Sequence, residues 1–327
     1  MLDLSFFLDT YYAYDFNRPK VDRVFTTQPT KHDSPSINLA HVDWKLSQDK
    51  VRSRLAFHAG DSVERNAITE PGPEKYIQES YVGFKIGDET WLDGGIFYGH
   101  IGAEAWVSKD NWTYTRALNL DYVPYYSAGL RLQHQLNPQE SFQFQVINGW
   151  QNISENNSAK AVGMQYKNIL TEKIVFTYNN FFGDEQVVSN KPRFRGYHNF
   201  ILENKFNNLW QFLFAVDFGH QSQQTEQGVD TWSTSTITTR RIIDFNRSLA
   251  LRLEHYNDAQ EANVKTPLKK GFIVQGGSIN YDQILLGQIL WRTEYRYFQS
   301  KQKIYPLKNG SKSNNNSFIV SSLSVSF

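Results

Sequence analysis

The strongest constraint on the fold comes from the end of the chain, SFIVSSLSVSF from Ser317 to Phe327. Alternate residues of this run fall on opposite faces of an extended strand, and the run ends on an aromatic residue. A strand needs partners for its backbone donors and acceptors, so we expect it to pair with another strand. The first alternating run, Leu4 to Phe16, is a suitable partner, and pairing the first strand with the last closes a sheet.

Strands of this kind recur along the chain at a regular interval. Each run of roughly ten residues is followed alternately by a tight turn and by a long polar loop, which predicts about 16 strands. The tight turns are expected at Ser47-Gln48-Asp49, Gly87-Asp88, Asn137-Pro138, near Asn168, Asn207-Asn208, Asp244 to Asn246 and Asp282-Gln283. The long loops are expected to include Asn17 to Pro35, Asp61 to Glu74, Gly99 to Asp121, Gly183 to Phe194, Gln221 to Gly228, Asp258 to Lys270 and Lys301 to Asn316.

Composition separates this chain from helical membrane proteins. The mean hydropathy is -0.55, and no segment approaches the roughly 18 uninterrupted apolar residues that a spanning helix needs. Aromatic residues nevertheless make up 15% of the chain, which is typical of a barrel with a wet lumen and aromatic girdles. A large soluble β-protein is the alternative. The absence of cysteine excludes disulfides, a thiolate nucleophile and a Cys-ligated zinc site.

These patterns predict an all-β fold, a single transmembrane antiparallel β-barrel over residues 1–327. An even strand number places both chain ends on the periplasmic side, with short turns there and long loops outside the cell. In a bilayer the sheet must close, because every backbone polar group has to be paired. The apolar faces would then contact outer-membrane lipid and lipopolysaccharide.

The charged faces of the strands are expected to line the lumen, because Lys or Arg on the lipid face costs roughly 2–4 kcal/mol at mid-bilayer. The alternative is that they form the solvated outside of a soluble sheet. The predicted lumen-lining residues are Arg52, Arg54, Glu79, Lys85, Arg131, Arg252, Glu254, Arg292, Glu294 and Arg296. The predicted aromatic girdle residues, near strand ends on the turn side, are Trp44, Trp210 and Phe327.

The longest insertion, about Gly99 to Asp121, is the natural obstruction in a barrel of this width. Folded inward, its mixture of small, charged and bulky aromatic residues would narrow the pore and set a local field. An outward surface loop is the alternative, although its aromatic content argues against full exposure. The predicted constriction residues are Glu104, Trp106, Lys109, Asp110, Trp112 and Arg116.

Two segments resemble a known family. GGIFYGHIGAEAWVSKDNWTYTRALNLDYVPYYSAGLRL, from Gly94 to Leu132, is similar to the OmpL-like outer-membrane β-barrel porins of Bacteroidetes and related bacteria, and RLEHYND, from Arg252 to Asp258, resembles a strand-end pattern of that family. A final strand ending in Phe also resembles the C-terminal signal of bacterial outer-membrane barrels. The resemblance implies a bacterial outer-membrane porin and brings no catalytic residue. A trimer is common for porins of this size. No signal peptide precedes Leu4, so we expect a mature chain.

Motifs that would indicate other functions are absent from the sequence. There is no G-x-S-x-G, Walker loop, dinucleotide fingerprint or H-E-x-x-H, so we predict no catalytic residue, no metal site, no cofactor and no enzymatic activity. The i, i+4 pair His100 and Glu104 lacks a third ligand. Glu254 and Glu294 are more typical of an arginine-rich ladder than of a glycosidase pair. The net charge of +1 indicates no nucleic-acid partner.

The main functional hypothesis is an outer-membrane porin that passes small hydrophilic solutes or ions by diffusion through a water-filled, loop-constricted lumen. Arg52, Arg54 and Arg131 suggest a weak anion preference. A second hypothesis is a barrel with a plugged lumen that serves as a surface receptor, an adhesin or a subunit of an outer-membrane complex. A third, an outer-membrane hydrolase, lacks any recognisable Ser/His/Asp arrangement. For assembly, the sequence leaves open a homotrimer or a larger envelope complex.

Overall fold

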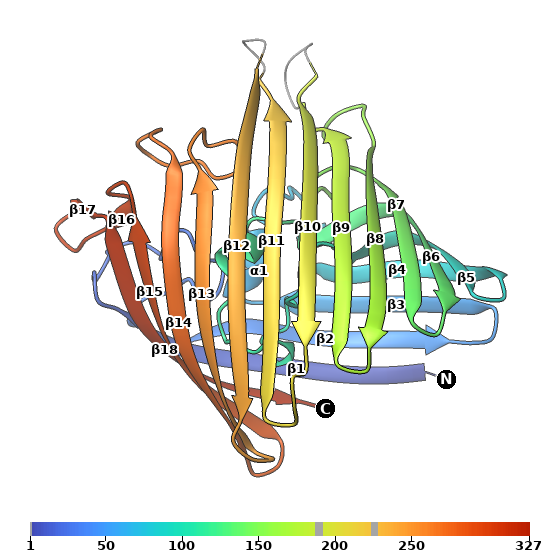
Figure 1. Cartoon of the computed structure of the whole chain (residues 1–327), viewed down its shortest axis with the longest axis horizontal. Helices are drawn as coiled ribbons and strands as arrows, with labels where there is room; N and C mark the ends of the chain where they lie inside the picture. Colours follow the sequence, from blue (N-terminus) through green and yellow to red (C-terminus); the bar gives the residue numbers. More distant parts are fainter. Residues whose placement is uncertain (1, 187–191, 224–227) are drawn as a thin grey trace.

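The computed structural model describes residues 2–186, 192–223 and 228–327. Within these residues the chain forms a closed antiparallel barrel of sixteen strands, which confirms the predicted fold class (Figure 1). Each strand pairs with its neighbours in sequence, and the first strand pairs with the last. The strands are tilted, so those at the front of Figure 1 cross the direction of those behind, as barrel closure requires.

The strand bounds agree with the predicted rhythm to within a few residues at most ends. The sixteen barrel strands are β1 (Leu2–Asp15), β2 (Ser36–Ser47), β3 (Val51–Ala59), β4 (Ile77–Gly87), β5 (Thr90–Tyr98), β6 (Tyr126–Asn137), β7 (Glu140–Ile147), β8 (Ala161–Thr171), β9 (Ile174–Asp184), β10 (Phe194–Asn204), β11 (Trp210–Ser222), β12 (Val229–Ile242), β13 (Arg247–Asp258), β14 (Phe272–Leu285), β15 (Ile289–Ser300) and β18 (Asn315–Ser326).

The connections differ in length between the two rims of the barrel. One rim carries short turns, at residues 48–50, 88–89, 138–139, 172–173, 205–209, 243–246 and 286–288. The other rim carries mostly long loops, at residues 16–35, 60–76, 99–125, 148–160, 185–193, 223–228, 259–271 and 301–314. The predicted loops Gly183 to Phe194 and Gln221 to Gly228 include residues 187–191 and 224–227, which lie outside the described residues.

Short elements interrupt several of the long loops. They are α1 (Asp61–Asn66), the 3-10 turns η1 (Pro73–Tyr76) and η2 (Ser108–Asp110), α2 (Leu118–Asp121), and the two-stranded sheet of β16 (Tyr305–Pro306) and β17 (Lys312–Ser313). No helix in the described residues is long and apolar enough to cross a membrane.

One predicted turn is wrong. Asp282-Gln283 lies within β14, and the chain reverses at Leu286 and Gly287, which both have positive φ. The two polar residues suggested a turn, but Asp282 faces inward and accepts hydrogen bonds from Arg292 on β15. The third long loop is also longer than predicted, because β6 begins at Tyr126.

The barrel places polar side chains inside and apolar side chains outside. On β13 the side chains of Arg252 and Glu254 face inward and are 1% and 5% exposed, whereas Leu251 and Leu253 face outward and are 47% and 67% exposed. A soluble sheet would bury the leucines and expose the charges. This reversed alternation is the arrangement that a lipid-facing barrel with a polar lumen requires.

The chain ends meet at the seam of the barrel. β1 pairs with β18 from Phe7 opposite Ser326 to Asp15 opposite Phe318. Phe6 and Phe327 extend this ladder, because each donates its backbone N–H to the carbonyl of the other at 3.0 Å, and their rings stack with centroids 6.5 Å apart. The aromatic C-terminus therefore belongs to the closed sheet.

An apolar cluster fills part of the lumen near the long-loop rim. Its loop members include Ile101, Tyr114, Leu118 and Val264. They pack against inward-facing aromatic residues of the wall, which include Phe97, Phe181, Tyr197, Trp232, Tyr256, Phe272, Phe298 and Phe318. Long loops from different parts of the chain are therefore held inside the barrel mouth by hydrophobic burial.

Candidate functional site: the lumen and the loop inside it

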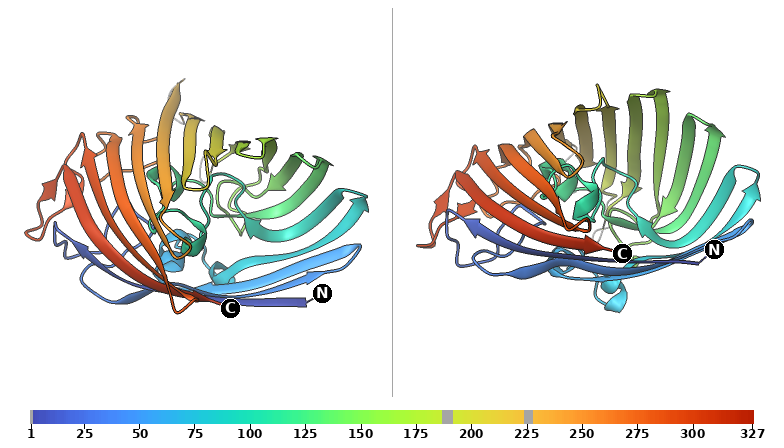
Figure 2. Two further views of the ribbon diagram at one scale, coloured as in Figure 1. Left: turned by 60° about the horizontal axis from the view of Figure 1, so that its bottom comes forward. Right: turned by 90° about the horizontal axis from the view of Figure 1, so that it is seen from below.

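Residues 99–125, called loop 3 below, lie within the barrel, where α2 is seen between the curved walls (Figure 2). The loop makes hydrogen bonds to strands on several sides of the lumen. They include Gly102 N to Asn199 Oδ1 (3.3 Å), Asn119 Nδ2 to Asp217 Oδ2 (2.8 Å), Tyr114 N to Asn280 Oδ1 (3.1 Å) and Ser108 Oγ to Asp9 Oδ2 (2.8 Å). The wall around β9–β15 and β1 therefore carries the loop.

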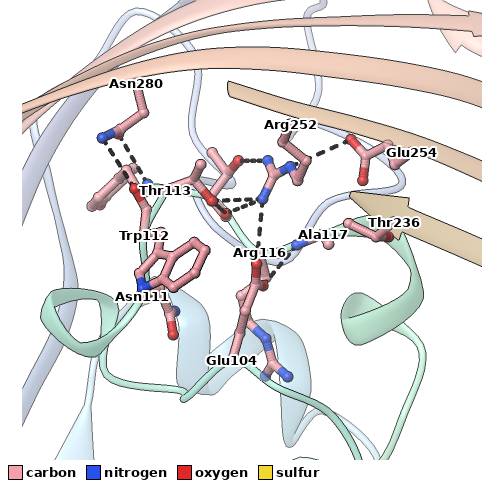
Figure 3. Close-up of polar contacts among 12 residues, drawn as sticks. Glu104, Asn111, Trp112, Thr113, Arg116, Ala117, Thr236, Arg252, Glu254 and Asn280 are labelled. Atoms are coloured by element: carbon pink, nitrogen blue, oxygen red, sulfur yellow. Dashed lines mark hydrogen bonds and ion pairs between the residues drawn. The ribbon is translucent and has the colours of Figure 1, made fainter. Parts of the chain in front are cut away.

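Arg252 on β13 holds the middle of loop 3 (Figure 3). Its Nη1 donates to Thr113 Oγ1 and to the carbonyl of Thr115, both at 2.7 Å. Its Nη2 donates to Thr115 Oγ1 at 2.6 Å and to Glu294 Oε1 at 3.0 Å. The guanidinium is thus shared between the loop and the wall, which suits its rigid fork of donors.

Two arginines of β15 bind loop 3 in the same way. Arg292 donates to the carbonyl of Asn111 at 2.7 Å and to the carbonyl of Ser108. Arg296 donates to the carbonyl of Arg116 at 2.7 Å. Arg292 and Arg296 are at most 1% exposed. Like Arg252, these cations of the predicted ladder hold the loop and do not face a water-filled path.

The acidic residues of this wall complete the attachment. Glu294 Oε2 accepts from the backbone N–H of Thr115 at 2.7 Å, and Glu254 Oε2 accepts from that of Leu118 at 2.7 Å. Within the loop, Glu104 Oε2 accepts from the N–H of Ala117 at 2.9 Å (Figure 3). Backbone donors of an irregular segment inside the barrel are therefore satisfied by buried carboxylates, as a low-dielectric interior requires.

The other predicted constriction residues occupy different environments. Trp106 is buried, and its indole N–H donates to Ser62 Oγ at 2.7 Å. Arg116 is buried with its guanidinium carbon 3.9 Å from the ring centroid of Tyr125. Trp112 packs against the cluster of Ile201, Leu213 and Ala215. Lys109 and Asp110, in η2, are the exposed members of the predicted set.

The opposite wall, β2–β6, carries its own charge pairs. Arg52 donates to both carboxylate oxygens of Asp93 at 2.7 Å, and Arg131 Nε donates to Asp93 Oδ2 at 2.9 Å. Arg54 donates to the two oxygens of Asp43 at 2.9 and 2.8 Å and forms an ion pair with Glu79. The predicted lumen residues of this wall are thus grouped around carboxylates, and Arg52 remains partly exposed. Lys85 lies two inner-face positions beyond Tyr81 and is partly exposed.

The predicted girdle residues lie on the outside of the barrel. Trp44 is 36% exposed and its ring meets that of Phe57 edge-on at 6.3 Å. Trp210 is partly exposed and carries the guanidinium of Arg241 over its ring at 5.5 Å. Phe327 is 69% exposed at the seam.

Sequence reasoning missed several residues that build the site. Asp43 and Asp93 were recognisable, since each alternates with apolar neighbours on a predicted strand. Asp282 was hidden by the wrong turn. Thr113 and Thr115 bind arginines that are more than 130 positions away in sequence, and no local pattern indicates such pairs.

Burial also raises the pKa of two carboxyl groups of loop 3. Removal from water raises the pKa of Glu104, although Arg252 opposes this effect. Burial raises the pKa of Asp121 to about 6, against the opposing influence of Arg296 and of the hydrogen bond from Thr27. Within residues 2–186, 192–223 and 228–327, no group of three or more His, Asp or Glu side chains is arranged to hold a metal ion.

A family model described as "Putative beta-barrel porin-2, OmpL-like" matches residues 1–327. The chain belongs to this porin family. As a member, the porin resides in the bacterial outer membrane and forms a passive channel there, in agreement with its closed barrel and reversed alternation. The family expected from the Gly94 to Leu132 segment is thereby confirmed.

Solved outer-membrane channels share the porin's fold over their whole length. The anion-selective porin from Comamonas acidovorans has a TM-score of 0.68 at 7% identity, covering 100% of this chain and 99% of that chain. The channel DcaP of Acinetobacter baumannii has a TM-score of 0.68 at 10% identity (100% and 97% covered), and Salmonella typhi OmpF in complex with daunomycin has 0.64 at 12% (100% and 97%). No curated protein matches the sequence.

Proposed function

We propose that the porin passes small hydrophilic solutes along the β3–β8 side of the lumen, beside loop 3. The observation that supports this path is the different exposure of the polar side chains on the two sides of the lumen. The arginines of β13 and β15 are bound to loop carbonyls, whereas the inner side chains of Arg52, Trp91, Gln133 and Gln165 stay partly exposed. Water and solutes pass most easily where polar wall groups remain accessible.

Loop 3 acts as the constriction in this proposal. It fills the lumen next to the β9–β15 wall, and Lys109 and Asp110 present one charge of each sign to the remaining space. The partly exposed Arg52 and the buried Arg131 share the carboxylate of Asp93, so the local field is weak. Solutes are therefore selected by size and polarity, with at most a weak anion preference, and the protein has no catalytic role.

A second function is favoured by one observation, the apolar cluster at the long-loop rim. If this cluster seals the lumen, the barrel is a receptor, an adhesin or a subunit of an outer-membrane complex. The outward apolar faces contact lipid and lipopolysaccharide under either function.

For assembly we propose a homotrimer, the form in which the Vibrio cholerae protein OmpT, a fold neighbour, was solved. Chemical cross-linking of folded protein tests this assembly.

Single-channel recording in a planar bilayer under a salt gradient tests the proposed channel. We expect stable ohmic steps and a reversal potential close to zero with a small anion bias. Folded, heat-modifiable protein that gives no conductance would favour the sealed barrel. A large reversal potential of either sign would contradict the compensated charges of the accessible wall.

A further inference from the structure

A row of polar side chains follows the inner wall from strand to strand. The strand registers place each member directly opposite the next, so that together they form a continuous row across neighbouring strands. The row, called the amide row below, consists of Trp91, Gln133, Gln143, Gln165, Asn179, Asn199 and Asp217 on β5–β11. Five of these seven residues are amides, which carry no charge.

Hydrogen bonds in the first part of the amide row run in one direction. Arg52 donates to Gln133 Oε1, and Gln133 Nε2 donates to Gln143 Oε1 at 2.8 Å. A guanidinium can only donate, so it fixes the orientation of both amides. The Oε1 of Gln143 is thus occupied, and its NH₂ group is the end of this amide that can donate to a further partner.

The second part of the row has the same direction. Gln165 Nε2 donates to Asn179 Oδ1 at 2.9 Å, Asn179 Nδ2 donates to Asn199 Oδ1 at 2.7 Å, and Asn199 donates to Asp217. Both side-chain oxygens of Asp217 accept hydrogen bonds, one from Asn199 and the other from Asn119 and Thr234, so Asp217 fixes this orientation from the far end. Both amide hydrogens of Gln165 have acceptors, since Nε2 also donates to the carbonyl of His100 at 2.8 Å.

The row is interrupted between Gln143 and Gln165. These residues face each other across β7 and β8, yet among the described residues no hydrogen bond joins their side chains. Gln143 therefore offers a donor and Gln165 an acceptor on the two sides of the gap. A hollow of about 350 Å³ lies here, and its lining also includes Trp91, Arg52 and Gln133.

The chemistry of the gap favours a neutral ligand. An amide donor facing an amide acceptor matches a hydroxyl group, which both donates and accepts. Two donors of Arg52 are held by Asp93, and the guanidinium carbon stacks 4.6 Å from the ring centroid of Trp91. The indole supplies apolar surface for C–H groups, and a free carboxylate would find no uncompensated cation.

We propose that the gap in the amide row binds a neutral polyhydroxylated solute of the saccharide class as it crosses the lumen. This inference rests on the proposed channel function, because such a solute reaches the gap only through an accessible lumen. The gap lets the solute replace the missing amide-to-amide hydrogen bond, with Trp91 alongside.

Titration calorimetry on the folded full-length porin in detergent tests the site, with maltotriose as the probe. The double variant Gln143→Ala/Gln165→Ala should bind about tenfold more weakly, a loss of about 1.4 kcal/mol, because both hydrogen bonds to the solute are removed. Gln143→Ser is a milder second variant with the same expected direction. Gln211→Ala, an inner-face glutamine of β11 outside the row, is the matched control and should bind like the wild type.

Planar-bilayer recording separates this inference from the channel function. If the pores conduct, and maltotriose reduces the current of the wild type more than that of the double variant, the channel function and the saccharide site are both supported. Conducting pores without maltotriose binding, or with equal binding in the double variant, overturn the saccharide site and leave the channel intact. Stronger block by acetate than by maltotriose also overturns it. If the protein does not conduct, but binds maltotriose in detergent and the double variant binds it more weakly, the channel function is overturned and the saccharide site is supported.

Discussion

At the scale of single residues, Arg252 is the side chain on which loop 3 depends most. Arg252→Ala would leave Glu294 as a buried charge without its cation and would remove the two hydrogen bonds that Arg252 donates to Thr115. We expect the free energy of unfolding to fall by about 3–5 kcal/mol. Urea unfolding in detergent, followed by tryptophan fluorescence, measures this change.

Arg247→Ala is the matched control on the same strand. Arg247 pairs with Asp244 at the short-turn rim, where both side chains are well exposed, so little change in stability is expected. Equal effects of the two substitutions would show that the buried arginine does not hold the loop.

The raised pKa of Asp121 predicts that the free energy of unfolding depends on pH. Its pKa of about 6 in the folded protein lies above that of the unfolded chain, so the folded state holds the proton more tightly. The stability gained from this carboxyl is lost as pH rises toward the folded pKa. Between about pH 5 and about pH 7.5 the contribution falls by about 1.4 kcal/mol, or tenfold in the unfolding equilibrium.

Comparing wild type with Asp121→Asn isolates this group from other titrating residues. Unfolding curves at the two pH values should show a smaller loss of stability in the variant, because the substituted amide cannot ionise while its oxygen can still accept from Thr27. The same pH dependence in both proteins would assign the effect to other groups.

At the scale of elements, a pair of glycines allows β5 and β6 to curve. Gly95 and Gly129 lie opposite each other with φ of +141° and +154°, and a Cβ at Gly129 would come within 2.1 Å of the carbonyl oxygen of Val146. Gly129→Ala should destabilise the barrel by about 1–3 kcal/mol. Gly94→Ala is the control, since its nearest neighbour is a flexible Leu130 methyl at 3.3 Å.

Chemical denaturation of both glycine variants measures this effect. If Gly129→Ala is as stable as Gly94→Ala, the barrel wall can relax around the added methyl and the glycine pair does not determine its curvature.

Loop 3 is the element expected to limit conductance. Replacing residues 103–116 with a short Gly-Ser linker removes the segment that binds Arg252, Arg292 and Arg296, which leaves these cations facing water. Single-channel conductance should rise several-fold, and anion preference should increase. Shortening another long loop at its exposed tip, residues 308–311, is the control. Unchanged conductance in the loop 3 variant would mean that the narrowest point lies elsewhere.

At the scale of the whole molecule, closure depends on a seam between the two chain ends. Ser321 on β18 pairs with Tyr12 on one side and Thr293 on the other. Ser321→Pro removes a backbone donor within a sheet that is paired on both sides, so we expect no closed barrel. Electrophoresis without heating reports this as loss of the fast-migrating folded form. Lys303→Pro, at an exposed residue of the loop at 301–314, should fold normally.

The barrel architecture could be predicted because its signals are local and repeated. Alternation on each strand separates the lipid face from the lumen face, and loop length separates the two rims. A local error such as the turn at Asp282-Gln283 leaves the overall architecture unchanged. Arg252 and Glu254 could be assigned to the inner face from their neighbours alone, because side chains alternate strictly along a strand.

The sequence by itself therefore determined the barrel, its strand number and the faces of its strands, because a period of two can be read within ten residues. Only the tertiary structure decided what the inner face does. Arg252 meets Thr115 and Gln133 meets Gln143 through loop packing and strand register, which depend on contacts across the closed barrel. For that reason the predicted arginine ladder became the support of loop 3, and the uncharged amides of Gln133 and Gln165 remained partly exposed on the other side of the lumen.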